Sequence, residues 1–497
     1  MNVRRLPAWV PYALLAAASC APLFVVERPP LQDLPLHMAA TRVIHDLHDA
    51  TYGFDGVFQT NLGQTQYVLY HVLASVLAYV VGVSFANRLL LCAYLGGTIL
   101  ATRYLLQVLG RDERLCVFVG PLLVNIMFIF GLAPFLFAIP FMVLGTALVA
   151  RYYENPTWTL GAGVAVLSIA MFYLHVFPLG LFGLAALALF PWTKPRRWFV
   201  AAAPGLPVAA LIAWWSLATS AGKLARGAIL HPAEPSPLSP WGKLLDSFNW
   251  LGDTFRDHSD EVLWGVVFGL VIVSTIVAVA QGKRWSWRML RYALVPGACV
   301  FLFCVTGEHN GNIWLIWQRF PLLFCLTMVP LFDVPKGWPG RVVTSAAVAV
   351  ALAVTINTCI HFRRFQRDDV ADFDDALAQM EPRKHVIGLI YWKESSVTWR
   401  HPFVHFVSYY QVEKGGVVEF TFAGFPHWPY HFAKGNCPPQ GCQARLDWEW
   451  ETDRVTMAET YPYFDYVLTR GDGFDPKDRY RKKWSGGPWA VWERRPN

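Results

Sequence analysis

Charged residues are scarce in this 497-residue sequence: Asp, Glu, Lys and Arg together make up 15%, whereas soluble domains carry roughly 25%. Hydrophobic residues reach 55%, and the mean hydropathy is +0.33. This balance excludes a water-soluble globular protein, because most of the chain has to lie in lipid. The net charge of +7 does not indicate nucleic-acid binding, since the basic residues cluster between apolar segments, as membrane orientation requires.

A clear signal-peptide cleavage site is also missing. The first apolar segment, 8–26, follows a basic start and is long enough to cross a bilayer. Because no small-x-small site follows it and further apolar segments do, we interpret it as a retained anchor.

Clusters of Lys and Arg separate the apolar segments and set their orientation. They lie at 4–5, 103–114, 194–197, 283–291 and 336–341. Placing these clusters in the cytoplasm predicts about eleven crossings with an extracytoplasmic C-terminus. The predicted crossings are 8–26, 88–107, 115–131, 134–151, 159–174, 176–191, 199–219, 261–281, 291–306, 318–332 and 342–360.

Residues 67–84 are apolar but do not fit this topology. Counting them as a crossing would place the basic cluster 194–197 on the wrong face. We therefore expect one interfacial or re-entrant helix here, with a break at Gly82. A protein with about twelve crossings is the alternative.

The character of the sequence changes after Ile360, which predicts a transmembrane domain, 1–360, with a first extracytoplasmic loop at 27–66, and a second domain, 361–497. The second domain reads as a small extracytoplasmic α/β domain with strands at 385–391, 466–469 and 489–492. Gly415-Gly416 is typical of a hairpin turn between strands 406–412 and 417–422.

Most of the nine cysteines lie inside apolar segments and act as small hydrophobic residues. Cys437 and Cys442 differ, because they lie in the predicted outer domain, where the compartment favours a disulfide. Together with His427 and His431 they also have zinc-like spacing, so a zinc site is the alternative.

The first outer loop carries an acidic residue and a histidine close to the membrane surface, Asp33 and His37. Pro35 suits the first turn of a helix, so Asp33 is expected to cap that helix and His37 to lie in its first turn. The two side chains then face one spot, as candidate catalytic residues. A plain N-cap is the alternative explanation for Asp33.

The predicted topology brings further polar residues to the same membrane boundary, where ionisable side chains are functional candidates. The candidate substrate-binding residues are His175, Glu308, His309 and Arg319. His175 lies in a tight turn between two apolar helices and has a simple capping role as its alternative. Arg319 begins a crossing, where it either reaches to the interface or holds a phosphate with its planar guanidinium.

The order of these features resembles the GT-C superfamily of membrane glycosyltransferases, which take sugars from polyprenyl-phosphate carriers. Asp33-Leu34-Pro35-Leu36-His37 resembles the first-loop Asp-x-x-x-His of bacterial GT-C-like proteins. Trp317-Gln318-Arg319-Phe320-Pro321 is similar to their late Gln/Arg/Phe/Pro segment, with the residue order altered. No Asp-x-Asp or Asp-Glu pair accompanies Asp33, which leaves a divalent metal and the exact reaction open.

This resemblance implies a hexosyl- or pentosyltransferase of the inner (plasma) membrane that serves the cell envelope. Its partners would be a lipid-linked sugar donor, membrane lipids and a glycan, lipid or protein acceptor, with Asp33 as the catalytic base. Trp428, Tyr430 and Trp448 of the outer domain are candidates to hold an acceptor glycan. A lipid or small-molecule transporter or flippase is an alternative, although internal repeats are not evident; a non-catalytic membrane assembly protein is another.

Overall fold

The computed structural model describes residues 9–230, 238–309, 313–438, 451–455 and 461–496, together with residues 7 and 236. The chain forms two compact units. The first comprises 1–25, 90–128 and 134–360, and the second comprises 26–89, 129–133 and 361–497. The domains 1–360 and 361–497 remain a prediction.

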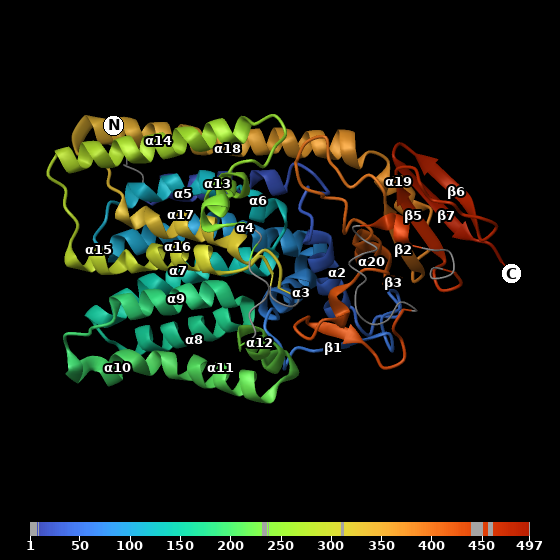
Figure 1. The fold of residues 1–497 in the computed structure, drawn as a ribbon, viewed down its shortest axis with the longest axis horizontal. Helices are drawn as coiled ribbons and strands as arrows, with labels where there is room; N and C mark the ends of the chain where they lie inside the picture. The colour runs from blue at the N-terminus through green and yellow to red at the C-terminus, as the bar shows by residue number, and fades with distance from the viewer. Residues whose placement is uncertain are drawn as a thin grey trace, which may run out of the picture. The chain divides into compact units, whose positions relative to one another are not determined.

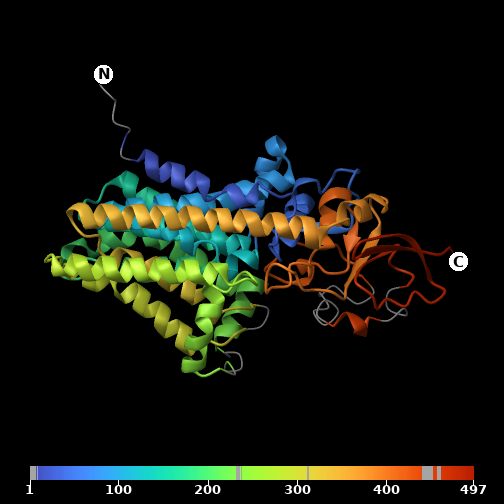
Figure 2. The ribbon, with the colours of Figure 1, turned by 90° about the horizontal axis from the view of Figure 1, so that it is seen from above.

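Helices make up the first unit (Figure 1). Their bounds are α1 Val10–Ala18, α4 Val83–Val108, α5 Val119–Leu122, α6 Ile126–Ile129, α7 Ala133–Glu154, α8 Trp158–Leu174, α9 Val176–Leu189, α10 Trp198–Ala202, α11 Leu206–Ala218, α12 Ser220–Leu230, α13 Pro240–Leu251, α14 Ser259–Ala280, α15 Trp287–Tyr292, α16 Leu294–Val305, α17 Phe320–Met328 and α18 Gly337–Arg364. The helices α14 and α18 lie side by side in Figures 1 and 2, and Asn357 Nδ2 donates to Ser259 Oγ between them, at 2.8 Å.

Among the described residues, six helical segments are long and apolar enough to cross a membrane: Val83–Val108, Ala133–Glu154, Pro195–Ala218, Ser259–Ala280, Trp287–Val305 and Gly337–Val370. Four shorter apolar segments accompany them: Val10–Leu23, Leu69–Val81, Trp158–Leu174 and Val176–Leu189. The prediction of a polytopic α-helical membrane protein is confirmed, and the count of about eleven crossings stays a prediction.

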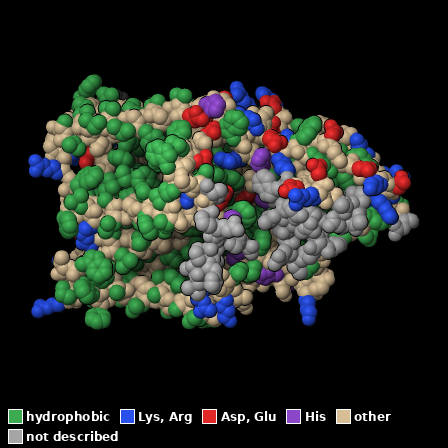
Figure 3. Space-filling view, viewed as in Figure 1, with side chains coloured by type: hydrophobic (Ala, Val, Ile, Leu, Met, Phe, Trp, Pro, Cys, Tyr) green, Lys and Arg blue, Asp and Glu red, His purple; other side chains and the backbone are tan. Residues whose placement is uncertain are grey.

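Hydrophobic side chains gather on the helices of the first unit in Figure 3. On α14, for example, Ile272, Val273 and Ile276 are each more than half exposed, at 55%, 54% and 63%. Exposed aliphatic side chains on a 22-residue helix are what a lipid-facing surface requires.

Residues 115–131, predicted as one crossing, are instead broken into short pieces. A 3₁₀ helix, Glu113–Phe118, is followed by α5 and α6. Asn125 lies at the break and bonds the local backbone: its Nδ2 donates to Leu122 O at 2.8 Å and its Oδ1 accepts from Phe128 N at 3.1 Å. Asparagine competes in this way with regular helical bonding, which average hydrophobicity does not reveal.

The second unit combines helices with two sheets. Its helices are α2 Leu34–His45, α3 Leu69–Val81, α19 Phe373–Ala378 and α20 Ser408–Lys414. Its strands are β1 Phe58–Thr60, β2 His385–Ile390, β3 Val417–Val418, β4 Tyr430–Phe432, β5 Tyr466–Arg470, β6 Tyr480–Gly486 and β7 Trp489–Arg494. The larger sheet has the order β3-β2-β5-β7-β6, with β2 parallel to both β3 and β5. The predicted C-terminal α/β sheet region is therefore present.

The small sheet joins the first outer loop to the C-terminal segment within this unit. Strand β1 pairs antiparallel with β4, with Phe58 opposite Phe432. A buried core forms around the pair from Ala40, Val43, Phe54, Phe58, Val417, Ala423, Trp428, Tyr430 and Phe432. The start of α2 is thus anchored on residues from the far end of the chain.

Two glycine positions show how local signals were used. The predicted break at Gly82 is confirmed: α3 ends there with φ +79°, and α4 begins at Val83. The predicted hairpin at Gly415-Gly416 is wrong, because residues 408–414 form α20 and Gly415 ends that helix at φ +73°. Glycine with positive φ is the usual end of a helix as well as a turn residue, so the same pair fits both structures.

Candidate functional site

The backbone around Asp33 is held by the short segment 129–133. Asp33 N donates to Phe130 O, and Gln32 N donates to Ile129 O, both at 2.9 Å. Gly131 is required here, because its φ is +70° and a Cβ would lie 2.9 Å from Leu34 N. The beginning of α2 is therefore fixed independently of any side-chain cap.

The Asp33 side chain does not have the predicted capping role. In the described part of the chain it makes no capping hydrogen bond, although Asp33 occupies the N-cap position of α2. Its Oδ1 instead lies 3.3 Å from His405 Nε2. Asp33 and His405 side chains are 16% and 5% exposed, so this contact is largely shielded from water.

His405 was not among the residues identified from the sequence. Its ring stacks on Phe420, with centroids 4.8 Å apart and planes at 21°. It is a single polar residue inside the apolar run Pro402-Phe403-Val404-His405-Phe406-Val407, which is a signal of a buried polar role. That signal does not say which distant residue the histidine meets.

His37 is buried one turn after Asp33 and contacts a second histidine, His71 of α3. His37 Nδ1 lies 3.1 Å from His71 Nε2, and His71 Nδ1 lies 2.9 Å from Tyr67 O. Burial, followed by the neighbouring His71 and His405, holds the pKa of His37 well below its ordinary value. His37 is therefore a neutral imidazole at neutral pH.

Polar contacts lock α2 to the helices that follow it. Ser75 Oγ donates to Thr41 O at 3.2 Å, and Tyr70 OH donates to Asn87 Oδ1 at 3.0 Å. Asn87 Nδ2 in turn donates to Thr41 Oγ1 at 3.3 Å. Rings also surround His37, with Trp428 and Tyr70 centroids at 5.6 and 5.9 Å.

The outer-domain aromatics predicted to hold a glycan are placed differently. Trp428 and Tyr430 are core side chains, only 4% and 1% exposed. Trp428 packs on His37 and His71, and Tyr430 OH lies 2.7 Å from Thr421 Oγ1. They support the site from within; Trp448 lies outside the described residues.

In the first unit, His175 and Arg319 come together as the sequence analysis predicted for substrate-binding residues. Arg319 Nη1 lies 2.6 Å from His175 Nε2, while its Nε and Nη2 donate to Leu315 O and Trp314 O at 3.0 and 3.1 Å. The guanidinium also lies 5.0 Å from the Phe135 ring centroid. These are uncharged partners, which fix the orientation of the guanidinium without neutralising its charge.

His175 combines both roles that its position suggested. It ends α8 and begins α9, and its Nδ1 accepts from Phe177 N at 3.2 Å. Its other ring nitrogen faces Arg319. The capping function and the contact with Arg319 therefore coexist in one side chain.

Glu308 and His309 lie in the loop that leads to Arg319. Glu308 O accepts from Ile316 N at 2.9 Å, which closes the loop on itself. The His309 ring stacks on Trp314, with centroids 4.8 Å apart. Since Trp314 O accepts a hydrogen bond from Arg319, His309 is connected to the arginine through one residue.

Cys437 is disulfide-bonded. Its predicted partner, Cys442, lies outside the described residues, so the pairing remains a prediction. A cysteine in a disulfide has no thiolate to bind zinc, which favours the disulfide over the alternative zinc site with His427 and His431.

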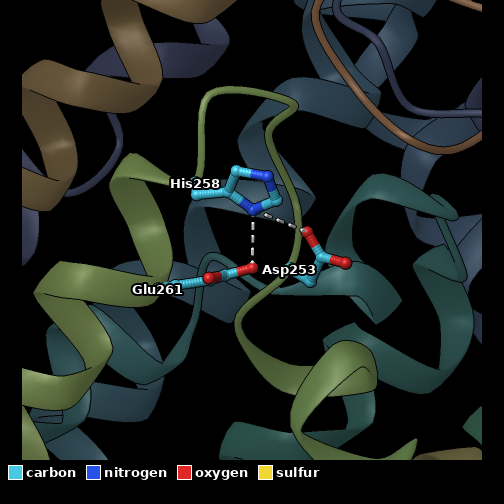
Figure 4. Close-up of side chains that lie close together, drawn as sticks. All are labelled: Asp253, His258 and Glu261. Carbon is cyan, nitrogen blue, oxygen red and sulfur yellow. Dashed lines mark hydrogen bonds and ion pairs between the residues drawn. The ribbon is translucent and has the colours of Figure 1, made fainter.

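A further cluster with metal-ligating side chains precedes α14 (Figure 4). His258 Nδ1 lies 2.8 Å from Glu261 Oε1 and 3.9 Å from Asp253 Oδ1. The two carboxylates raise the pKa of His258 above its ordinary value, Glu261 first. The group is thus explained as a charge cluster that closes the loop between α13 and α14.

Comparison with known proteins gives a match at the level of structure. No family model matches the sequence, and no curated protein matches it either. The crystal structure of ArnT from Cupriavidus metallidurans in the apo state is 11% identical, covers 97% of both chains and has a TM-score of 0.53. The same protein bound to undecaprenyl phosphate is also 11% identical, with 98% coverage of both chains and a TM-score of 0.53.

A third structure is the arabinofuranosyltransferase AftD from mycobacteria, at 15% identity and a TM-score of 0.46. It covers 99% of this chain and 40% of its own. At 11% identity, the likeness to ArnT concerns the fold, and it extends over nearly the whole of both chains.

Proposed function

We propose, from the GT-C fold that this chain has, that it is a membrane glycosyltransferase of the inner membrane. It would move a sugar from a polyprenyl-phosphate donor to a glycan, lipid or protein acceptor on the extracytoplasmic face, where the C-terminal domain would also lie. The observation that carries the proposal is the position of Asp33: a shielded carboxylate beside His405 that does not cap its helix.

Asp33 would be the general base. As the acceptor oxygen attacks the anomeric carbon, the O–H bond breaks and its proton passes to the Asp33 carboxylate. A carboxylate serves this purpose when it lies within hydrogen-bond reach of the proton. His405 would keep one carboxylate oxygen in place, since its Nε2 is already 3.3 Å from Oδ1.

Arg319 would hold the phosphate of the carrier. The bond between the anomeric carbon and the phosphate oxygen breaks, and the electron pair stays on the phosphate, which is already a stable anion. A guanidinium fixed in advance stabilises this charge without reorganising, and its planar shape suits a phosphate. The backbone carbonyls of Trp314 and Leu315 and the ring of His175 supply that fixation.

The carrier class follows from the neighbour's ligand. One of the ArnT structures is bound to undecaprenyl phosphate, and we extend a polyprenyl phosphate of this kind to the present chain. Its prenyl tail would lie among the apolar helices.

The test is lipid-linked product analysis in cells lacking the protein, complemented with the wild type, Asp33→Asn or Asp55→Asn. Asp55 is an exposed carboxylate of the same outer loop, 74% exposed, and serves as the matched control. We expect a lipid-linked sugar to accumulate in the deletion and in Asp33→Asn cells, while Asp55→Asn restores its consumption. Full restoration by Asp33→Asn at normal expression would reject Asp33 as the base; an unchanged lipid profile in the deletion would reject the function.

A further inference from the structure

A chain of hydrogen-bonding groups ends at His37, and the proposed reaction makes no use of it. Tyr67 O lies 2.9 Å from His71 Nδ1, and His71 Nε2 lies 3.1 Å from His37 Nδ1. The His71 ring is fully buried, and the His37 ring is 6% exposed. Buried polar groups of this kind have defined donors and acceptors.

The chemistry of the three groups fixes where the protons are. A carbonyl oxygen only accepts hydrogen bonds, so His71 Nδ1 carries the proton that points at Tyr67. A neutral imidazole has one N–H, which leaves His71 Nε2 with a lone pair. His37 must then donate from Nδ1, and His37 Nε2 is left as a lone pair on the opposite side of the ring.

This assignment requires both imidazoles to be neutral. An imidazolium at His71 would place a charge in a ring without exposed surface, which is unfavourable unless the charge is paired. For His37, burial and the adjacent His71 and His405 keep the pKa well below its ordinary value. The groups that surround the His37 ring are Tyr70, His71 and Trp428, with His405 close enough to influence its titration.

The free lone pair belongs to the same neighbourhood as the Asp33 carboxylate. His37 follows Asp33 by one helical turn, and His37 N donates to Asp33 O at 3.1 Å. His405 contacts the Asp33 carboxylate and also lowers the pKa of His37, so it lies close to both side chains. An acceptor-only nitrogen next to a general base has one kind of natural partner, the hydroxyl of a sugar.

We propose that His71 is a positioning residue that holds His37 in the tautomer with a free Nε2, and that this nitrogen accepts a hydrogen bond from a sugar hydroxyl. The inference rests on the proposed glycosyltransferase function and assigns to His37 a role in substrate recognition. The hydroxyl comes from either the donor sugar or the acceptor, and kinetics with each substrate separates the two sources.

The first experiment compares His71→Phe, His71→Gln and Ser75→Ala in full-length protein, with radiolabelled undecaprenyl-phosphate-linked sugar and an envelope extract as the acceptor. Phenylalanine keeps the ring volume but removes the acceptor for His37 Nδ1, whereas the glutamine Oε1 restores one. Ser75→Ala removes a different buried bond between α2 and α3 and controls for loosened helix packing.

We expect His71→Phe to raise the KM of one substrate about fivefold to tenfold, the value of one neutral hydrogen bond. Its kcat should stay within about twofold, because a bond made equally in the ground and transition states affects KM alone. His71→Gln and Ser75→Ala should resemble the wild type. Equal effects of His71→Phe and Ser75→Ala, or no rescue by glutamine, would overturn the proposal.

The second experiment needs no activity and no variant that must fold. Solid-state NMR of ¹⁵N-histidine-labelled wild-type protein, with the His37 signals assigned by their loss in His37→Gln, reports which ring nitrogen carries the proton. We expect a protonated Nδ1 and an unprotonated Nε2, and a protonated Nε2 would contradict the tautomer assignment. If this result holds while Asp33→Asn retains full transfer, the proposed base fails and the His37 assignment stands.

Discussion

The Asp33 carboxylate lies 3.3 Å from His405 Nε2, although the two residues come from opposite ends of the chain. Asp33 is supplied by the start of α2, and His405 by the segment before α20. The pair is enclosed by rings, with Phe420 stacked on the imidazole. A carboxylate held in this way keeps a single orientation, which is what a general base requires.

The contact predicts a defined effect of removing His405. In His405→Phe the new ring can stack on Phe420 as before, but Asp33 loses its polar neighbour. We expect kcat of sugar transfer to fall about tenfold to a hundredfold, because a hydrogen-bonding contact to a charged group contributes about 1.5–3 kcal/mol. His405→Gln, whose amide N–H reaches a similar position, should retain most of the activity in the same radiolabel assay. A wild-type rate for His405→Phe would contradict this role.

Arg319 is expected to determine affinity for the lipid carrier. Arg319→Gln removes the charge, and Arg319→Lys keeps the charge but loses the planar pair of N–H donors. We expect the Kd for undecaprenyl phosphate, measured by native mass spectrometry in detergent, to rise at least about tenfold in both variants. Arg288→Gln is the matched control, because Arg288 forms an ion pair with Glu154. Equal affinities for the Arg319 and Arg288 variants would argue against a phosphate site.

His427 is expected to make the protein less stable in mildly acidic solution. Burial, with a smaller effect of His431, lowers the pKa of His427 from 6.5 to about 4. Between these two values the unfolded chain binds a proton that the folded protein does not, so stability falls as pH decreases from 6.5 towards 4. His427→Phe, which preserves the stacking on Phe425, should flatten the dependence of Tm on pH over this interval. An unchanged slope would show that other groups control the acid sensitivity.

Gly415 is expected to be essential for packing around the first outer loop. An added Cβ would lie 2.1 Å from Tyr52 O, at a backbone φ of +73°. Gly56 has the same φ of +73°, but nothing lies within 4 Å of its Cβ position. Gly56→Ala should therefore show only the backbone effect, about 1 kcal/mol, whereas Gly415→Ala should lower Tm several degrees further. Equal Tm values for the two variants would show that the close approach to Tyr52 is unimportant.

Much of the secondary structure could be predicted because it depends on residues close together in sequence. The apolar segments, the break at Gly82 and the strands β2, β5 and β7 follow from local composition and periodicity. Local signals failed where one pattern fits two structures. Gly415-Gly416 ends a helix instead of turning a hairpin, and Asn125 interrupts an apolar segment that reads as a continuous crossing.

The candidate site was predictable only in part, for the same reason. Asp33 and His37 share one helical turn, so their proximity follows from spacing. The partners that define their chemistry, His405 and His71, come from other elements. The pairing of His175 with Arg319 was expected only as a shared membrane boundary, and the 2.6 Å contact between them emerged from the fold.

The sequence by itself therefore determined that this is a multi-pass membrane protein with an acidic residue and a histidine after its first apolar segment, because hydrophobicity and helical spacing are local properties. The tertiary structure decided what those two residues do. It turned the Asp33 carboxylate towards His405 instead of the helix terminus, and it placed His71 where it sets the tautomer of His37. Such contacts join residues far apart in the chain, and only packing of the folded core determines which of them meet.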